Sequence, residues 1–520
     1  MFHEGERLAP LNELLRGAIP YRDIYLQHGL FYNAWRPLLA SKLFGPSLAG
    51  DRMLGHILDP LGFCTFYILT LQVFRSKLSA FLLIWALSSG VSQGFFFWTP
   101  AQRMVYTPGR LTLAFLTIAI IAFYIKNENR RYLLAISGIC STATIFYSLE
   151  IGLYTTVSCL IFLLILSVKQ KKLFPLPIYI LGLFIAFLPL LIYFTIYMAI
   201  DDLFINSYIQ TRYQIIIWGL KFPPLFSELA NLKSIEGVKT FLLSYTFKWY
   251  LPILVYLITA TYLAYKAITF LLWKEKCNII LLLVFISGVV FFRTMLGRSD
   301  STHLYGLEYA WIIGFLFAEK LFARSWKELK ENFNAYKSTD SKHISAIVCR
   351  IAIIFLILWY VISAYNPIDS ARSLAKNLTG YQKIERYVIP PLDRIGMISI
   401  PTDQAGQIKA VVEYIQNNTS PDETIFDFSN QGAYYFFADR PSATRYHQIC
   451  YASTKKMQKE VIDSLEQNKT KLVIFSNNTW MDSIDGVKNT DRHYLVYEYL
   501  KDKYVESAKV GTTIFMKRKE

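Results

Sequence analysis

The chain has 520 residues, of which 53% are hydrophobic and 18% charged, and its mean hydropathy is +0.31. A soluble globular protein carries about 25% charged residues, so the composition excludes a soluble protein and indicates several membrane spans. A net charge of +16 would indicate nucleic-acid binding in a soluble protein. Here the basic residues follow the apolar segments, and we expect no nucleic-acid partner. The six cysteines show neither metal-ligand nor disulfide spacing.

Residues 1–50 form a polar head that precedes the apolar part of the chain. The head carries the carboxylates Glu4, Glu6, Glu13 and Asp23 together with histidines and arginines, and it has no long apolar run. Ionisable groups gathered next to membrane spans are usually functional, so we expect chemistry here. The alternative interpretation of the same composition is a solvated N-terminal leader.

Two amphipathic helices are predicted within the head. Leucines at helical spacing predict a helix over residues 5–18 that ends at Gly17 and Pro20, and an aromatic-rich helix is predicted over residues 30–44. Both suit a membrane interface, where aromatic rings and an apolar stripe lie at the headgroup level. They equally suit packing on a helix bundle. No signal-peptide pattern is recognisable, and we expect one further span before residue 1 in preference to a head that is translocated unaided.

About ten membrane-spanning helices are predicted after the head. Each is an apolar run long enough to cross about 30 Å of hydrocarbon as a helix. The expected spans are 53–74, 78–97, 108–125, 132–147, 150–168, 175–200, 247–272, 277–295, 304–322 and 345–365. Glu150 interrupts the stretch from 132 to 168, which is therefore the least regular of them.

Basic residues mark alternate connections between these spans. They lie near residues 75–77, 126–131, 169–172, 274–276 and 320–342. Because Lys and Arg are enriched in cytoplasmic loops, this side is predicted to be cytoplasmic. The exoplasmic (periplasmic) side of an inner, or plasma, membrane then receives the head, the turns 98–107 and 295–303, the corner at 147–150, the loop 201–246 and the tail after 366.

The tail differs in composition from the spans and predicts a small soluble α/β domain. Helical patterns over 407–416 and 455–466 are each followed by a short β-branched and aromatic run, at 424–428 and 471–475. The predicted fold is therefore mainly α, a polytopic membrane helix bundle. Its expected parts are the head at 1–50 with exoplasmic juxtamembrane helices, the spans at 51–366, and an exoplasmic α/β domain at 367–520.

Four polar clusters lie on the predicted exoplasmic rim. They are the head, Arg103 with Tyr106 and Arg110, Glu150 flanked by Tyr147 and Tyr154, and the 297–303 turn with Arg298, Asp300 and His303. If the spans bundle, these clusters meet at one mouth. Arginine binds phosphate oxygens bidentately, and a nearby carboxylate can take a proton from an attacking hydroxyl. The combination indicates transfer of a group from a phosphate leaving group to an acceptor hydroxyl.

Each cluster also has a purely structural explanation. Arg298 and Asp300 could form a salt bridge within their turn, and Glu150 could be a paired structural acid. Arg103 and Arg110 could anchor helix ends at the membrane interface. The position of all four clusters on one side of the membrane favours a site.

These residues resemble a known class of membrane enzymes. The resemblance is to the first exoplasmic loop of GT-C glycosyltransferases, and it is carried by His3-Glu4-Gly5-Glu6, the Leu-rich helix ending in Arg16-Gly17, Pro20-Tyr21-Arg22-Asp23, Gly29, and Leu43-Phe44-Gly45 with Arg52. The nearest branch is the bacterial glycosyltransferase family 39 type, akin to protein O-mannosyltransferases and to the aminoarabinose transferase of lipid A. In layout it covers about residues 1–320, but specific residues match only in the head and at Arg298-Ser299-Asp300 with His303.

The resemblance implies inverting transfer of a sugar from a polyprenyl phosphate, with an acidic residue after the first span as catalytic base. That acid usually belongs to an Asp-Glu pair, whereas here the pair reads His3-Glu4. By this resemblance Glu4 is the first candidate base and Glu6 the second, with Asp23 and His3 in support. The arginines that would hold the lipid phosphate are Arg103, Arg110 and Arg298.

The sequence thus predicts a polyprenyl-phosphate-sugar-dependent glycosyltransferase that acts on a glycan, lipid or protein acceptor at the exoplasmic membrane face. The candidate substrate-binding residues are His3, Arg22, His28, Arg103, Tyr106, Arg110, Glu150, Arg298, Asp300 and His303. No metal ligands and no cofactor are predicted, and a requirement for a divalent cation is left open. The alternatives are a transporter or flippase, or a polymerase or ligase, of lipid-linked glycans. The internal repeats typical of transporters are not visible, which favours an enzyme.

Overall fold

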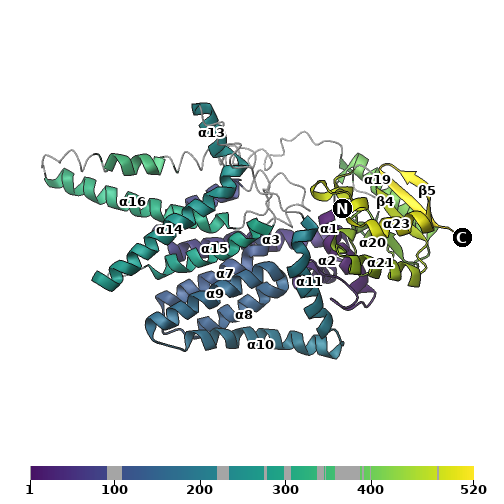
Figure 1. Ribbon diagram of the computed structural model, residues 1–520, viewed down its shortest axis with the longest axis horizontal. Coiled ribbons are helices and arrows are strands. Elements are labelled where there is room, and N and C mark those ends of the chain that lie inside the picture. Colours follow the sequence, from purple (N-terminus) through teal and green to yellow (C-terminus); the bar gives the residue numbers. More distant parts are fainter. Residues whose placement is uncertain are drawn as a thin grey trace.

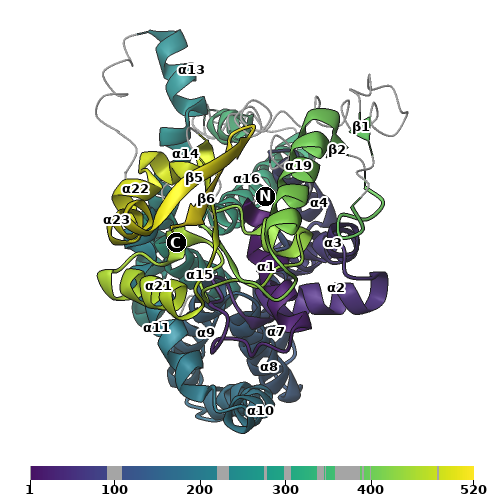
Figure 2. The same cartoon turned by 90° about the vertical axis from the view of Figure 1, so that its right-hand side faces the viewer.

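The computed structural model describes residues 2–90, 108–218, 234–273, 278–297, 306–335, 345, 347–355, 357, 387–388, 392–398, 400–476 and 479–519. A bundle of long helices carries a mixed α/β domain at one end, and the head lies between the two (Figure 1). Figure 2 views the molecule from the domain's side, where the strands and helices of the domain lie in front of the bundle.

Long apolar helices form the bundle. Their bounds are α3 Leu48–Val73, α4 Lys77–Gly90, α7 Pro108–Lys126, α8 Tyr132–Tyr147, α9 Leu149–Gln170, α10 Pro175–Ile196, α14 Tyr245–Trp273, α15 Ile279–Gly297 and α16 Leu307–Ala335. Helix α3 packs on α7, α8 packs on α7 and α10, and α15 packs on α9 and α16. Phe115 and Phe162 are buried in their shared core, whereas Leu164 and Phe184 are exposed. Exposed apolar faces of this kind suit a bundle surrounded by lipid.

Within the described part of the chain, five helices are long and apolar enough to cross a membrane. They are α3, α9, α10, α15 and the Thr246–Thr269 part of α14. Each overlaps an expected span, and α8 is a shorter apolar helix at the expected 132–147. The prediction of a mainly helical, polytopic membrane protein is therefore confirmed. Most of the expected span 345–365 and the end of 78–97 lie outside the described residues.

Two helices lie in the connection that was expected to be a loop over 201–246. They are α11, Ile200–Trp218, and α13, Ile235–Leu243. Asn206 of α11 bonds the backbone of Leu26 in both directions, accepting from its N–H at 3.2 Å and donating to its carbonyl at 3.1 Å. Polar residues such as Asp201 and Asp202 lower the hydropathy of α11, so it gave no span signal. Its packing against the head nevertheless orders it as a helix.

Both predicted helices of the head are present. The first is α1, Phe2–Leu15, and Gly17 follows it with φ +90°, a left-handed conformation that ends the helix as predicted. The second consists of the π-helix η1, Phe31–Trp35, followed by α2, Arg36–Phe44. All residues from Glu4 to Asn12 are buried, so α1 is enclosed by protein on every side.

The C-terminal part of the chain is an α/β domain, in which the predicted helices at 407–416 and 455–466 and the predicted strands at 424–428 and 471–475 are present beside others that were not predicted. The bounds are β1 Tyr387–Val388, β2 Ile400–Pro401, α19 Thr402–Asn418, β3 Ile425–Asp427, α20 Ala433–Phe437, η2 Ile449–Tyr451, α21 Lys455–Gln467, β4 Leu472–Ser476, η3 Trp480–Asp482, η4 Ile484–Gly486, α22 Asn489–Arg492, α23 Tyr494–Lys503, β5 Tyr504–Val510 and β6 Thr513–Arg518. The main sheet has the order β3-β4-β6-β5. Strands β3 and β4 are parallel, and the other neighbours are antiparallel. The parallel pair is fully buried, as its apolar sequence requires.

The head packs into the hydrophobic cores of this domain. Phe2 and Tyr25 belong to the same buried cluster as Phe426, and Leu8 belongs to the same cluster as Ile474. Gly5 allows α1 to approach the start of α20 closely, because a Cβ at this position would lie 2.7 Å from the Ala433 nitrogen. Helix α1 therefore joins the bundle to the domain.

Candidate active site

Helix α1 places two carboxylates, Glu4 and Glu6, at the junction between the bundle and the C-terminal domain. Glu4 is 4% exposed and Glu6 is 6% exposed. A buried carboxylate is stable only where positive charge or hydrogen-bond donors compensate for the water it has lost. The two residues have different partners, which give them different chemical properties.

Glu4 is held by an arginine of α3. Its Oε1 accepts hydrogen bonds from Nε of Arg52, at 2.9 Å, and from Nη2 of the same residue. Burial alone would raise the pKa of Glu4, but the Arg52 guanidinium outweighs burial and the pKa falls to about 2. Glu4 is therefore an anion whose charge is matched by a cation in direct contact.

Glu6 is held by a tyrosine and two histidines. The Tyr451 hydroxyl donates to Oε1 at 2.5 Å, while Nδ1 of His3 lies 3.5 Å and Nε2 of His28 lies 3.6 Å from Oε2. Burial raises the pKa of Glu6, but His28 and His3 more than offset it and hold the pKa well below its usual range. Among the described residues, no lysine or arginine forms an ion pair with Glu6. It is ionised at neutral pH and keeps its negative charge unmatched by a permanent cation.

The turn that carries His28 is fixed to α1 by Asn33 of η1. The side-chain oxygen of Asn33, Oδ1, accepts from the backbone N–H of His28 at 2.7 Å. The side-chain nitrogen of Asn33, Nδ2, donates to the backbone carbonyl of Glu6 at 2.8 Å. Burial and the nearby Arg110 lower the pKa of His28, although Glu6 opposes them. Burial and Arg110 thus disfavour positive charge on His28, whereas Glu6 favours it.

A second ion pair links α1 to α3 beside the first. Arg7 is fully buried, its Nη2 lies 2.9 Å from Oδ2 of Asp51, and its Nη1 donates to the Tyr32 hydroxyl at 3.2 Å. Each helix thus supplies one acid and one arginine, since Glu4 pairs with Arg52 and Arg7 pairs with Asp51. These two reciprocal pairs fix the position of α1 on the bundle.

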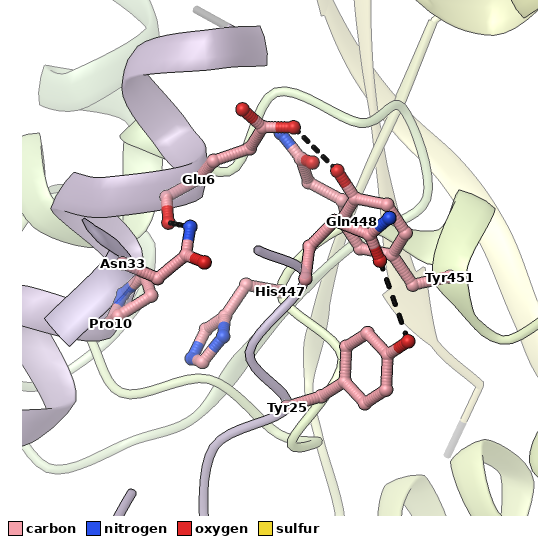
Figure 3. A pocket seen from close by; sticks show the side chains of 8 residues that line it. Glu6, Pro10, Tyr25, Asn33, His447, Gln448 and Tyr451 are labelled. Carbon is pink, nitrogen blue, oxygen red and sulfur yellow. Dashed lines mark hydrogen bonds between the residues drawn. The ribbon is translucent and has the colours of Figure 1, made fainter. Parts of the chain in front are cut away.

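Glu6 lies on the wall of a small pocket between α1 and the C-terminal domain (Figure 3). Tyr25, Asn33, His447, Gln448 and Tyr451 complete most of its lining. The free volume is about 10 Å³, room for about one water molecule or one hydroxyl group. His447 and Gln448 each present one buried polar atom, Nε2 and Oε1, with no hydrogen-bond partner among the described residues. The pocket is therefore polar and suited to a small hydroxylic group.

A wider groove of about 550 Å³ is lined by Arg52 but not by Glu4. Phe44 and Met53 line it together with Met397 of the segment before β2, and Arg52 contributes the charged wall. This volume falls within the range of about 300–1,000 Å³ that ligand sites usually have. Arg52 therefore separates a groove of ligand size from the Glu4 carboxylate.

The structure brings three of the four predicted polar clusters together as far as they are described. Arg110, at the start of α7, donates to the Ser148 hydroxyl at 3.0 Å, and the next residue, Leu149, donates its N–H to the His28 carbonyl at 2.8 Å. Tyr147 accepts from Nη1 of Arg36 at 3.0 Å. Glu150, in the first turn of α9, accepts from the Tyr154 hydroxyl at 3.3 Å. The head, Arg110 and the 147–150 corner thus form one contiguous region.

Arg22 and Asp23 lie in an exposed turn and pair with each other. Nε of Arg22 lies 2.9 Å from Oδ1 of Asp23, whose Oδ2 accepts from the Ile19 N–H at 2.8 Å. Arg22 also donates to the Tyr197 carbonyl at 3.1 Å. The pair fixes the turn onto the end of α10, and its predicted part in substrate chemistry stays a prediction.

Five of the predicted site residues lie outside the described residues. They are Arg103, Tyr106, Arg298, Asp300 and His303. Their predicted part in phosphate and substrate binding stays a prediction as well.

Sequence reasoning did not find the contribution of the C-terminal domain. Tyr451, His447 and Gln448 lie more than 440 positions from Glu6, so no local spacing connects them. The one available signal was composition, since His447 and Gln448 stand directly before the apolar residues Ile449 and Cys450. Among the described residues there is no group of three or more His, Cys, Asp or Glu side chains with metal-binding geometry.

The likeness to a solved structure shows a fold of the GT-C type. The chain is similar to the crystal structure of ArnT from Cupriavidus metallidurans bound to undecaprenyl phosphate, with a TM-score of 0.51 and 11% sequence identity over 99% of this chain and 93% of that one. It also matches the Archaeoglobus fulgidus oligosaccharyltransferase tethered with an acceptor peptide, with a TM-score of 0.42 and 11% identity over 100% of this chain and 70% of that one. No protein-family model matches the sequence, and no curated protein matches it. The predicted GT-C type is thereby confirmed for the fold.

Proposed function

We propose that this protein is an inverting glycosyltransferase that moves a sugar from a polyprenyl phosphate to an acceptor hydroxyl. The observation that carries the proposal is Glu6, a buried and ionised carboxylate on the wall of a hydroxyl-sized pocket in a GT-C fold. Such a group can receive the proton that an acceptor hydroxyl must lose when it attacks a sugar.

Glu6 is the better candidate base of the two acids on α1. The charge of Glu4 is matched by Arg52 in direct contact, so a proton arriving at Glu4 would have to compete with the guanidinium. Glu6 is bonded by the neutral hydroxyl of Tyr451 and borders the pocket. The geometry therefore supports the reverse of the order that the resemblance implied, with Glu6 first and Glu4 as part of the ion-pair framework.

In the proposed step, the acceptor oxygen forms a bond to the anomeric carbon from the face opposite the phosphate. The bond between that carbon and the phosphate oxygen breaks, its electron pair leaves with the polyprenyl phosphate, and the anomeric configuration inverts. The hydroxyl proton passes to Glu6. Because the transition state is oxocarbenium-like, this proton leaves late, when the attacking oxygen already carries positive charge. A carboxylate with a lowered pKa is then basic enough.

The arginines at the rim support a phosphate-bearing donor. Arg110 lies next to the His28 turn, and Arg103 and Arg298 are its predicted companions. A guanidinium keeps its charge at any physiological pH and binds phosphate oxygens bidentately. The similar ArnT structure is described as bound to undecaprenyl phosphate, which supports a polyprenyl phosphate as the donor here.

The proposal includes about ten spans in an inner (plasma) membrane, with the head and the C-terminal domain on its exoplasmic side. Arg110 begins α7 beside the head, and the basic residues Arg130 and Arg131 follow the end of α7. A helix of 19 residues spans about 28 Å, so these basic residues lie across the bundle from the head. This separation supports the orientation in which the basic turns face the cytoplasm.

The test is transfer of a labelled sugar by purified protein from a panel of polyprenyl-phosphate sugars, in the presence of a membrane-lipid and glycan extract as acceptor source. We expect one donor to support transfer, and we expect Glu6→Gln to lower kcat by about 10²–10⁴-fold. Donor consumption gives the sugar, and the labelled product gives the acceptor class. No transfer from any donor, with the protein folded and the donor bound, would point to a lipid-linked glycan transporter.

A further inference from the structure

We propose that Tyr451 of the C-terminal domain is a positioning residue for Glu6, and hence that this domain forms part of the active site. The inference rests on the proposed function, in which Glu6 receives the acceptor proton. It is carried by the hydrogen bond of 2.5 Å that the Tyr451 hydroxyl donates to Oε1 of Glu6, between side chains that are 4% and 6% exposed (Figure 3).

Two hydrogen bonds anchor the residues just before Tyr451. The backbone N–H of Cys450 donates to Oδ1 of Asn430 at 2.9 Å. The side-chain amide of Gln448 donates to the Phe2 carbonyl at 2.6 Å. The Tyr451 ring packs on Tyr25, with ring centroids 5.8 Å apart. The hydroxyl therefore points at Glu6 from a fixed direction, and it moves with the domain and with α1 together.

The chemical nature of the donor is important. Burial and the neighbouring Glu6 raise the pKa of the Tyr451 phenol well above its usual value, so the phenol keeps its proton. A neutral hydroxyl fixes one carboxylate oxygen without cancelling the charge, whereas an arginine, as at Glu4, fixes the oxygen and cancels the charge. Tyr451 thus orients Glu6 toward the pocket and leaves it able to receive a proton.

The experiment compares Tyr451→Phe with a matched control, Tyr504→Phe. Tyr504 is also a buried tyrosine of the domain, and its hydroxyl donates to the Thr470 carbonyl at 2.7 Å. For Tyr451→Phe we expect kcat for sugar transfer to fall about 10–100-fold while the KM for the polyprenyl-phosphate donor stays within about twofold. For Tyr504→Phe we expect both constants to stay within about twofold. Equal effects of the two substitutions on kcat would overturn the proposal.

A double-mutant cycle on thermal unfolding tests the same contact without using activity. If Tyr451 acts through Glu6, the loss of Tm caused by Tyr451→Phe is much smaller in a Glu6→Leu background, where residue 6 can no longer accept the bond, than in the wild type. Tyr504→Phe lowers Tm equally in both backgrounds. Additive Tm losses for Tyr451→Phe and Glu6→Leu would show that the tyrosine does not act through Glu6 and would overturn the inference.

The two readouts separate the inference from the function on which it rests. Non-additive Tm losses together with absence of transfer from every donor would support the contact between Tyr451 and Glu6 and contradict the glycosyltransferase assignment. Transfer by the wild type together with additive Tm losses would support the glycosyltransferase assignment and contradict the role of Tyr451.

Discussion

The two flanks of α1 stabilise buried carboxylates in opposite ways. On the bundle flank, Glu4 and Arg7 face Arg52 and Asp51 of α3 in two ion pairs, so the charges cancel in direct contact. On the domain flank, Glu6 is bonded by the Tyr451 hydroxyl and approached by two histidines. A single turn of helix thus carries both a framework of matched charge and one anion that is not matched by an arginine or lysine.

The difference shows how a buried acid can be structural or reactive. Removing one partner of a buried ion pair leaves an uncompensated charge, so such pairs resist change and hold helices in place. A carboxylate held by neutral donors keeps its charge available to an incoming proton. Burial alone does not distinguish Glu4 from Glu6, whereas the chemistry of their partners does.

The largest expected effect is the difference between two single substitutions, Glu6→Gln and Glu4→Gln. Glu6→Gln is expected to lower kcat about 10²–10⁴-fold because the proton acceptor is lost, whereas Glu4→Gln keeps kcat within about tenfold. Steady-state transfer by purified variants of equal monodispersity provides the measurement. A larger loss in Glu4→Gln than in Glu6→Gln would exchange the roles of the two flanks.

Loss of one charge on the bundle flank is expected to lower the stability of the protein. Arg7→Met leaves Asp51 buried without its guanidinium and is expected to cost about 3–5 kcal/mol of stability, because an unpaired buried charge is not solvated. The double variant Arg7→Met/Asp51→Leu should recover most of this loss. Thermal unfolding in detergent measures both, and a double variant as unstable as the single one would contradict the explanation.

Acid is expected to weaken the bundle flank in a defined window. The pKa of Glu4 is lowered from 4.5 to about 2, so its contribution to stability is fully present above about pH 4.5 and is lost as the pH falls toward 2. The loss amounts to about 3 kcal/mol. The Tm difference between wild type and Glu4→Gln should therefore shrink over this range. A difference that stays constant from pH 6 to pH 2.5 would show that Glu4 does not titrate there.

The smallest effect is expected at the rim of the same junction. Arg16 on the turn after α1 pairs with Asp439 at 2.8 Å, with side chains 28% and 48% exposed. Solvent screens such pairs, so Arg16→Ala should change stability by less than about 1 kcal/mol and leave transfer unchanged. If the loss is as large as that of Arg7→Met, exposure does not decide the strength of these pairs.

Sequence reasoning found the parts of the fold that depend on local pattern. Apolar runs placed the described spans, Gly17 marked the end of α1, and the runs at 424–428 and 471–475 became β3 and β4. The acids and histidines of the head predict a functional site, and His3, Glu4, Glu6 and His28 lie together at the junction between the bundle and the C-terminal domain.

The remaining features depend on contacts between distant parts of the chain. The polar residues of α11 concealed its helix, and the partners of Glu6 and Glu4 could not be told apart before Arg52 and Tyr451 were placed. The same carboxylate pattern permits either acid as the base. Only the tertiary arrangement shows that Arg52 cancels one charge and that Tyr451 preserves the other.

The bond between Glu6 and Tyr451 also fixes the order in which a new chain becomes competent. The two residues are 445 positions apart, and a ribosome adding about 5–20 residues per second needs roughly 20–90 s to travel that distance. Helix α1 therefore reaches the membrane long before the segment that completes its pocket has been synthesised. A growing chain carries its proposed base without its partner, and a truncated chain never acquires it. In the proposed mechanism, catalytic competence thus follows completion of the C-terminal domain.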